Sequence, residues 1–148
     1  MAYARCAVGI SGDGQESALI AAALKVAGRL GAESLLFLHV AQPLLLTSFL
    51  TDIPLSPEVP ILVERDPLAD AAALRDYVGQ QALLTEGLAV EYRVLSGEVS
   101  EGLRAVASSL DLMILGHHHM SGIARLFRHS TDERVLNNVR CQVLIVPA

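Results

Sequence analysis

The sequence predicts a single α/β domain built on a mainly parallel sheet, and three observations lead to this class. The chain has 148 residues, a length typical of one domain. Hydrophobic residues make up 52% of the chain but aromatic residues only 4%, so the core must consist mainly of aliphatic side chains. Short apolar runs alternate with segments of helical spacing, and this alternation is typical of right-handed βαβ units.

Five apolar runs are the predicted strands. Most of them are nearly continuous in Val, Ile and Leu, as expected of strands that are covered on both faces. The third run, AVEYRVL, alternates between apolar and polar residues, and we therefore expect it at an edge of the sheet. The runs span residues 6–10, 34–40, 89–95, 112–116 and 142–147.

Four segments between these runs are the predicted helices. The first, 16–30, has apolar residues on one face and Gly31 as a stop. For the second, 67–86, Asp66 and Pro67 form the expected cap and first turn, and Gly87 follows its end. Ser100 is the expected cap of a shorter third helix, and a brief fourth one is expected over 132–139.

Charge and hydropathy exclude several classes of function. The formal net charge is −5, and neither sign forms a long block, so we expect no nucleic-acid partner. The apolar runs are too short to span a bilayer and no signal peptide begins the chain, so we expect a cytoplasmic protein without a membrane partner. Cys6 and Cys141 lack metal-type spacing and are expected to be buried free thiols.

One connection is unusually long. The segment 41–66 is interrupted by prolines but keeps several leucines and a phenylalanine. We expect an excursion that covers part of the sheet or a partner subunit, and we favour this over a loop that touches a membrane, since no basic residue flanks the leucines.

The stretch LGHHHMSGIARLFRHS, residues 115–130, raises three chemical interpretations. Adjacent histidines in an extended segment point to alternate sides and no carboxylate completes a zinc-type set, which argues against a metal. Nothing brings a base and an acid to Ser130, and no nucleophile elbow, P-loop or dinucleotide fingerprint occurs, so we propose no catalytic residues. A phosphate-binding turn after Gly116 remains, with the alternative that Ser130 or Thr131 merely caps the next helix.

The segment DLMILGHHHMSGIARLFRHSTDERVLNNVRCQVLIVPA, residues 111–148, resembles the carboxyl third of the universal stress protein family. There the run DLIVMG is followed by a glycine-rich loop, then G-S, E-R-V-L and C-P-V-L-V-V. Residues 7–40 resemble the amino-terminal unit of the family, and VLSGEVSEGLRAVA resembles its glycine-containing turn before the third helix. The resemblance covers most of the chain outside 41–66.

Members that bind nucleotides use G-x-x-G, nine residues, then G-[ST], and the resemblance places this motif on the chain. Gly116 matches the first glycine, His119 and His129 stand where the other two belong, and Ser130 matches the hydroxyl. A Cβ and an imidazole at those positions restrict the turn that would hold phosphates, although imidazoles near neutral pH could also attract an anion.

Four further residues of the cleft follow from the same resemblance. Ile10 and Ser11 replace the Val-Asp whose carboxylate holds the adenosine, Val40 matches the residue whose backbone contacts adenine, and Gly97 belongs to the glycine-containing turn. The candidate cofactor-binding residues are thus Ile10, Ser11, Val40, Gly97, Gly116, His119, His129 and Ser130, for ATP or another adenine nucleotide.

The resemblance also implies the fold, the assembly and the function. The fold is a three-layer Rossmann-like, adenine nucleotide alpha hydrolase-like domain over 1–148 with five parallel strands in the order 3-2-1-4-5. The last strand pairs with a second subunit in a homodimer, and an unknown protein partner is expected. We favour the branch that lacks the glycine motif: a non-catalytic stress-response protein with a degenerate cleft. The alternative is an ATP- or AMP-binding protein or slow ATPase. Apart from the resemblance, a metal-dependent hydrolase that uses the histidine run stays open, and it would need at least one carboxylate or another histidine, His39 or His129, to converge on the loop.

Overall fold

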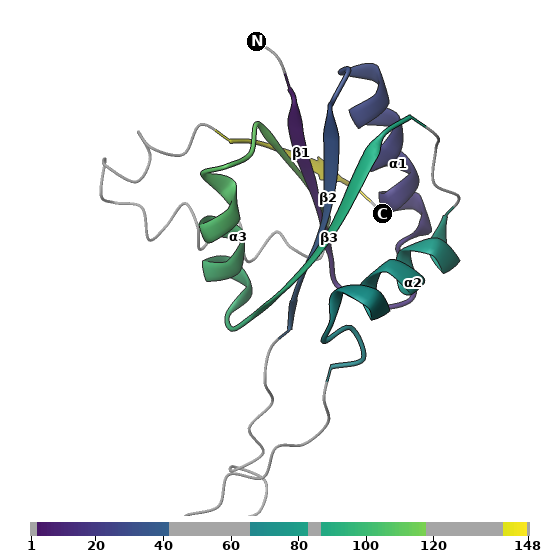
Figure 1. Cartoon of the computed structure of the whole chain (residues 1–148), viewed down its shortest axis with the longest axis vertical. Coiled ribbons are helices and arrows are strands. Elements are labelled where there is room, and N and C mark those ends of the chain that lie inside the picture. Colours follow the sequence, from purple (N-terminus) through teal and green to yellow (C-terminus); the bar gives the residue numbers. More distant parts are fainter. Residues whose placement is uncertain (1–2, 42–65, 83–86, 118–140, 148) are drawn as a thin grey trace, which may run out of the picture.

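The computed structural model describes residues 3–41, 66–82, 87–117 and 141–147 and confirms the predicted class. The five strands form one parallel sheet in the order β3-β2-β1-β4-β5, with three helices in the described part of the chain (Figure 1). The helix expected over 132–139 lies outside the described residues. The elements are β1 (Arg5–Ile10), α1 (Ser17–Arg29), β2 (Ser34–Ala41), α2 (Ala71–Gln81), β3 (Ala89–Ser96), α3 (Val99–Ala107), β4 (Leu112–Gly116) and β5 (Gln142–Val146).

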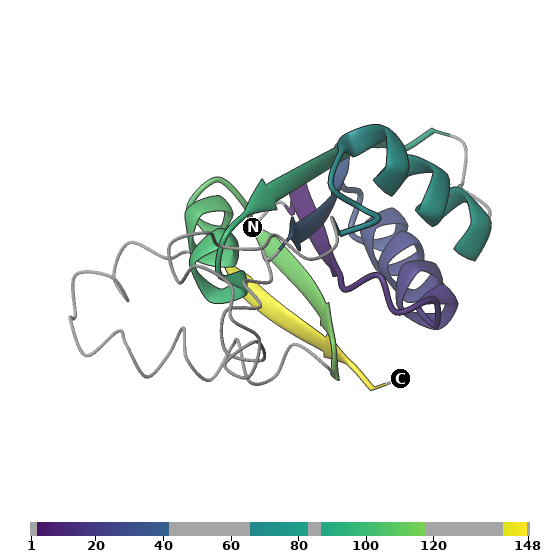
Figure 2. The same cartoon turned by 90° about the horizontal axis from the view of Figure 1, so that it is seen from below.

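The three inner strands are buried because helices cover both faces of the sheet. Helices α1 and α2 lie on one face and α3 lies on the other (Figures 1 and 2). Val8 of β1 packs into the cluster beneath α1 and α2, while its neighbour Ala7 packs into the cluster beneath α3. Strand β3 lies at the edge, and its burial alternates along the strand as the sequence predicts.

Two predicted helix starts are wrong. Helix α2 begins at Ala71 and not at Pro67, because Asp70 is its N-cap and accepts a hydrogen bond from Ala73 N at 2.7 Å. The carboxylate of Asp66 instead accepts from Leu68 N at 2.9 Å within a turn that precedes the helix. Helix α3 begins at Val99 with Glu98 as its N-cap, so Ser100 lies inside the helix.

Both cysteines are free, as predicted, but only Cys6 is fully buried and Cys141 is half-buried. Burial, assisted by the negative charge of Asp111, raises the pKa of the Cys6 thiol and raises that of Cys141 to about 11. In the described part of the chain, no helix has the length and apolar character needed to cross a membrane.

Candidate site at the carboxyl ends of the strands

The carboxyl ends of the parallel strands form one edge of the sheet, where α/β proteins bind their ligands. Ile10 at the end of β1 pairs in register with His39 of β2, and Gly116 ends β4 beside them. Val40 follows His39, and Gly97 N donates to Ala41 O at 3.0 Å. The structure thus places Ile10, Ser11, Val40, Gly97 and Gly116 along this edge, whereas His119, His129 and Ser130 lie outside the described residues.

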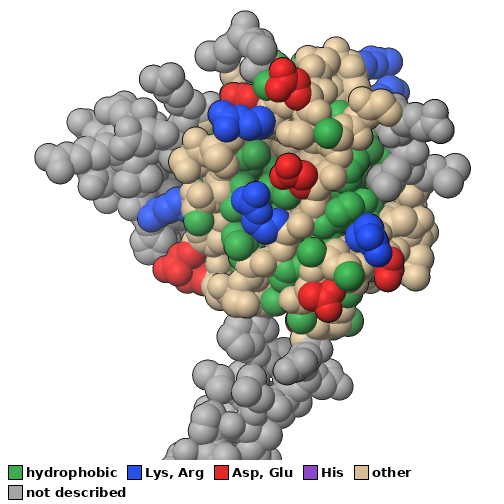
Figure 3. All heavy atoms as spheres, in the orientation of Figure 1, with side chains coloured by type: hydrophobic (Ala, Val, Ile, Leu, Met, Phe, Trp, Pro, Cys, Tyr) green, Lys and Arg blue, Asp and Glu red, His purple; other side chains and the backbone are tan. Residues whose placement is uncertain are grey.

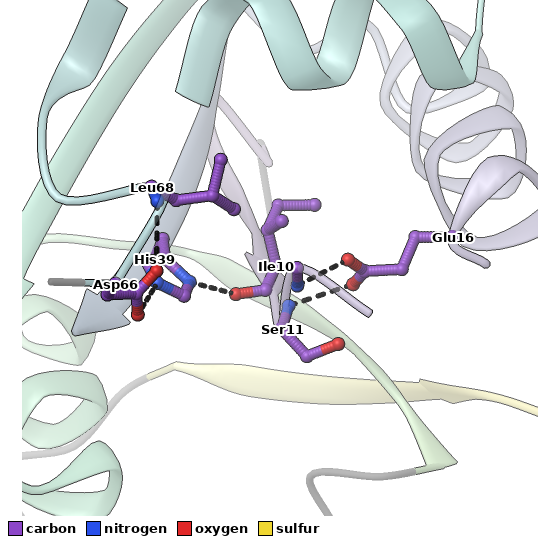
Figure 4. A network of polar contacts seen from close by, with 7 residues as sticks. Ile10, Ser11, Glu16, His39, Asp66 and Leu68 are labelled. Atoms are coloured by element: carbon purple, nitrogen blue, oxygen red, sulfur yellow. Dashed lines mark hydrogen bonds and ion pairs between the residues drawn. The ribbon is translucent and has the colours of Figure 1, made fainter. Parts of the chain in front are cut away.

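A buried carboxylate binds the backbone at the end of β1. Glu16 is only 4% exposed, although it directly precedes α1 on a loop. Its Oε2 accepts from Ser11 N at 2.8 Å, and its Oε1 accepts from Gly12 N at 2.7 Å (Figure 4). Two successive amides therefore hold one carboxylate, and the left-handed φ of +85° at Gly12 permits this tight loop.

Helix α2 completes the surroundings of this carboxylate. The hydroxyl of Tyr77 donates to Glu16 Oε1 at 2.7 Å and accepts from Gly14 N at 3.0 Å. Gln81 Oε1 accepts from Glu16 N at 3.1 Å. Burial, and then the hydrogen bond to Glu16, raises the pKa of Tyr77 well above its ordinary value, so the phenol stays a donor.

A second polar contact joins β2 to the segment before α2. His39 is 3% exposed, and its Nδ1 lies 2.7 Å from Ile10 O, so this nitrogen donates because a carbonyl oxygen only accepts (Figure 4). Its Nε2 lies 2.7 Å from Asp66 Oδ2. Partial burial opposes the charge of Asp66, but the bond from Leu68 N and the contact with His39 hold its pKa below the ordinary value.

Leu68 covers the backbone of the loop after β1. It is buried, and a Cβ added at Gly12 would lie 2.8 Å from Leu68 Cδ1. The turn at Asp66 and Leu68 therefore packs directly on the loop, held there by His39 (Figure 4). A side chain at position 12 would be strained by the positive φ, and it would also have to displace the end of the Leu68 side chain.

Helix α3 approaches the end of β2 closely. A Cβ added at Gly102 would lie 2.7 Å from Val40 Cγ2 and 3.6 Å from Leu95 Cδ1. At the end of β4, a Cβ added at Gly116 would lie 3.3 Å from Cδ2 of Leu19 in α1. The side chain of Val40 in β2 thus packs against the first turn of α3.

The sequence did not suggest Glu16 or Tyr77 as members of this site. Their positions are 61 residues apart, and each alone is typical of an exposed loop or of an amphipathic helix. Across the ranges that the structure describes, no group of three or more His, Cys, Asp and Glu side chains could hold a metal ion. Both ring nitrogens of His39, which the metal hypothesis considered, are already hydrogen-bonded within the chain.

Comparisons with known proteins agree with this architecture. The model of the family described as "Universal stress protein family" matches residues 2–147. A universal stress protein of Synechocystis sp. is 35% identical over 68 residues, which cover 45% of this chain and 44% of that protein. The match thus spans less than half of either sequence.

Solved structures of other proteins share this fold. A universal stress protein family member from Burkholderia pseudomallei has a TM-score of 0.55 at 22% identity, covering 99% of this chain and 97% of its own. A universal stress protein in complex with cAMP has a TM-score of 0.52 at 20% identity, covering 99% and 98%. The protein UspA from Lactobacillus plantarum has a TM-score of 0.52 at 16% identity, covering 99% of each chain.

Proposed function

The chain belongs to the universal stress protein family, and we propose from this premise that it is a non-catalytic stress-response protein with a degenerate nucleotide cleft. It would act as a homodimer that contacts a partner protein. The observation that carries the proposal lies at the end of β1, where the backbone amides of Ser11 and Gly12 already donate to the carboxylate of Glu16. Ser11 stands where the family resemblance places an aspartate, and Leu68 packs on Gly12 beside it.

Thermal-shift titration tests the degenerate cleft. ATP, ADP, AMP and cAMP are each titrated with and without Mg²⁺, and the melting temperature is recorded against nucleotide concentration. We expect no saturable rise, because Glu16 already occupies the amides of Ser11 and Gly12. A ligand that bound the folded state would add about 2.7 kcal/mol to the free energy of unfolding at a concentration one hundred times its Kd, so binding would be visible. A rise with ATP that saturates would contradict the proposal.

The two edges of the sheet differ in a way that supports a dimer through β5. Strand β3 exposes the charged residues Glu91 and Arg93, and charged side chains discourage edge-to-edge pairing. Figure 3 shows acidic and basic side chains scattered over the face that includes β3. Strand β5 carries no charged residue, and Val143 and Leu144 are each 37% exposed. A second copy that paired with β5 would cover these side chains.

Sedimentation velocity of matched variants tests the dimer. Leu144→Lys places a charge on the β5 edge, and Ala89→Lys places the same charge at an exposed position of β3. We expect the wild type and Ala89→Lys to sediment as dimers and Leu144→Lys to sediment as a monomer. A monomeric wild type, or a Leu144→Lys variant as dimeric as its control, would refute pairing through this strand.

An adenine-nucleotide binding protein, such as a sensor or a slow ATPase, is the second candidate function. The structural neighbour in complex with cAMP favours it, as do Val40, Gly97 and Gly116 at the edge. The cAMP and ATP arms of the titration decide between the two candidates. We further propose a cytoplasmic protein without a membrane partner, and the net charge of −5 supports the absence of a nucleic-acid partner.

A further inference from the structure

The bonding around Glu16 has the form of a ligand complex within one chain. We propose that the amides of Ser11 and Gly12 and the hydroxyl of Tyr77 form a carboxylate-binding site, and that Glu16 occupies this site so that no external anion can enter it. The inference goes beyond the proposed function, because it requires neither a dimer nor a nucleotide.

The donors match a carboxylate in number and position. Each oxygen of Glu16 accepts from a different amide, Oε2 from Ser11 N at 2.8 Å and Oε1 from Gly12 N at 2.7 Å. The third donor, Tyr77, reaches Oε1 at 2.7 Å. Hydrogen bonds of this length to an ionised acceptor are among the strong ones in proteins.

These donors must balance the charge, because no ion pair of the described residues includes Glu16. The ion pairs within the described ranges are His39–Asp66 and Arg75–Asp76, and neither includes Glu16. A carboxylate that is 4% exposed loses most of its hydration, and only hydrogen bonds aimed at it can replace that loss. Gly14 N donates to the Tyr77 hydroxyl and so strengthens it as a donor.

Emptying the site should turn it into a receptor for a small acid. The substitution Glu16→Ala removes one methylene group and the carboxylate, which together correspond to acetate. The amides belong to the backbone of the loop and remain after the substitution, as does Tyr77. Acetate therefore fits the vacated space. Formate lacks a methyl group and would leave the place of the Glu16 Cγ empty, and propionate would overlap the retained Cβ.

Glu33→Ala is the matched control, since Glu33 is exposed and loses the same atoms. Sodium acetate, formate and propionate are titrated into the wild type and both variants at constant ionic strength, with sodium chloride as the balancing salt. We expect Glu16→Ala to melt below the wild type and to regain roughly 4 °C in acetate in a saturable manner. The wild type and Glu33→Ala should show no such rise, and propionate should have a weaker effect.

Adding Tyr77→Phe to Glu16→Ala should weaken acetate binding several-fold, because one of three donors is lost. A Glu16→Ala variant that responds to acetate no more than Glu33→Ala would overturn the proposal. So would a wild type that responds as strongly as Glu16→Ala, since its site would then not be closed. If the variant does not fold alone, it should refold in acetate but not in chloride, and equal failure in both salts contradicts the proposal.

Discussion

Alanine at Gly102 should destabilise the protein, although alanine at Gly79 should stabilise it. Both glycines lie inside helices, where alanine normally adds about 0.5–1 kcal/mol to the free energy of unfolding. A Cβ at Gly79 meets nothing within 4 Å, so the full gain is expected there. A Cβ at Gly102 would lie 2.7 Å from Val40 Cγ2 and 3.3 Å from its Cγ1.

The contact with Val40 decides the sign at Gly102. Valine is branched at Cβ and cannot rotate freely, and Val40 is only 9% exposed where β2 faces α3. Overpacking of this kind costs about 1–3 kcal/mol, which exceeds the helical gain. The expected net loss for Gly102→Ala is about 1 kcal/mol, or a melting temperature lower by roughly 4 °C in a chain of this size.

Urea unfolding of five proteins measures these values: the wild type, Gly79→Ala, Gly102→Ala, Val40→Ala and the double variant Val40→Ala/Gly102→Ala. Gly79→Ala should unfold at a higher midpoint than the wild type, and Gly102→Ala at a lower one. In a Val40→Ala background the loss caused by Gly102→Ala should disappear, because the clashing methyl groups are gone. A Gly102→Ala protein that is stabilised as much as Gly79→Ala would refute the close approach of α3 to β2.

Three other substitutions or reagents test the remaining contacts. Because the pKa of Asp66 is lowered in the folded state, its ionised carboxylate stabilises that state above about pH 4, and this stabilisation is lost as the pH falls through the folded pKa. In Asp66→Asn, the free energy of unfolding should therefore fall less steeply with decreasing pH than in the wild type. Tyr77→Phe should cost about 1–3 kcal/mol in urea unfolding because Glu16 loses a donor, whereas Tyr92→Phe should cost far less; equal losses would contradict the role of the hydroxyl. With a pKa of about 11, Cys141 should react with iodoacetamide at pH 8 more slowly than a free thiol such as glutathione. Equal rates would contradict the partial burial of this thiol.

The fold was predictable because the hydrophobic pattern reports burial directly. Continuous apolar runs predicted the inner strands, and the alternation of AVEYRVL predicted an edge, since burial on both faces or on one produces these patterns. The start of α2 was not predictable locally. Asp66 and Asp70 are both good caps, and the fold uses Asp66 to bind His39, which lies 27 residues away.

The location of the candidate site could be predicted from the sequence, but the hydrogen bonds within it could not. Parallel strands bring their carboxyl ends to one edge, so Ile10, Val40 and Gly116 could be expected together. The burial of Glu16 could not, because it depends on Tyr77 from another helix and on loop amides that have no side-chain signature. The one signal that could have pointed there, an acidic residue directly after the glycine-containing segment SGDGQ, is too common to single out Glu16.

The unequal borders of the sheet bear on how far assembly can proceed. If two copies joined through β5, each would turn its charged β3 outward, and the combined sheet would end in that strand on both sides. Growth would stop there, because no uncharged border would be left to recruit a third copy. The same placement of Glu91 and Arg93 that keeps one border solvated would thus make the association self-limiting and guard the protein against forming fibres.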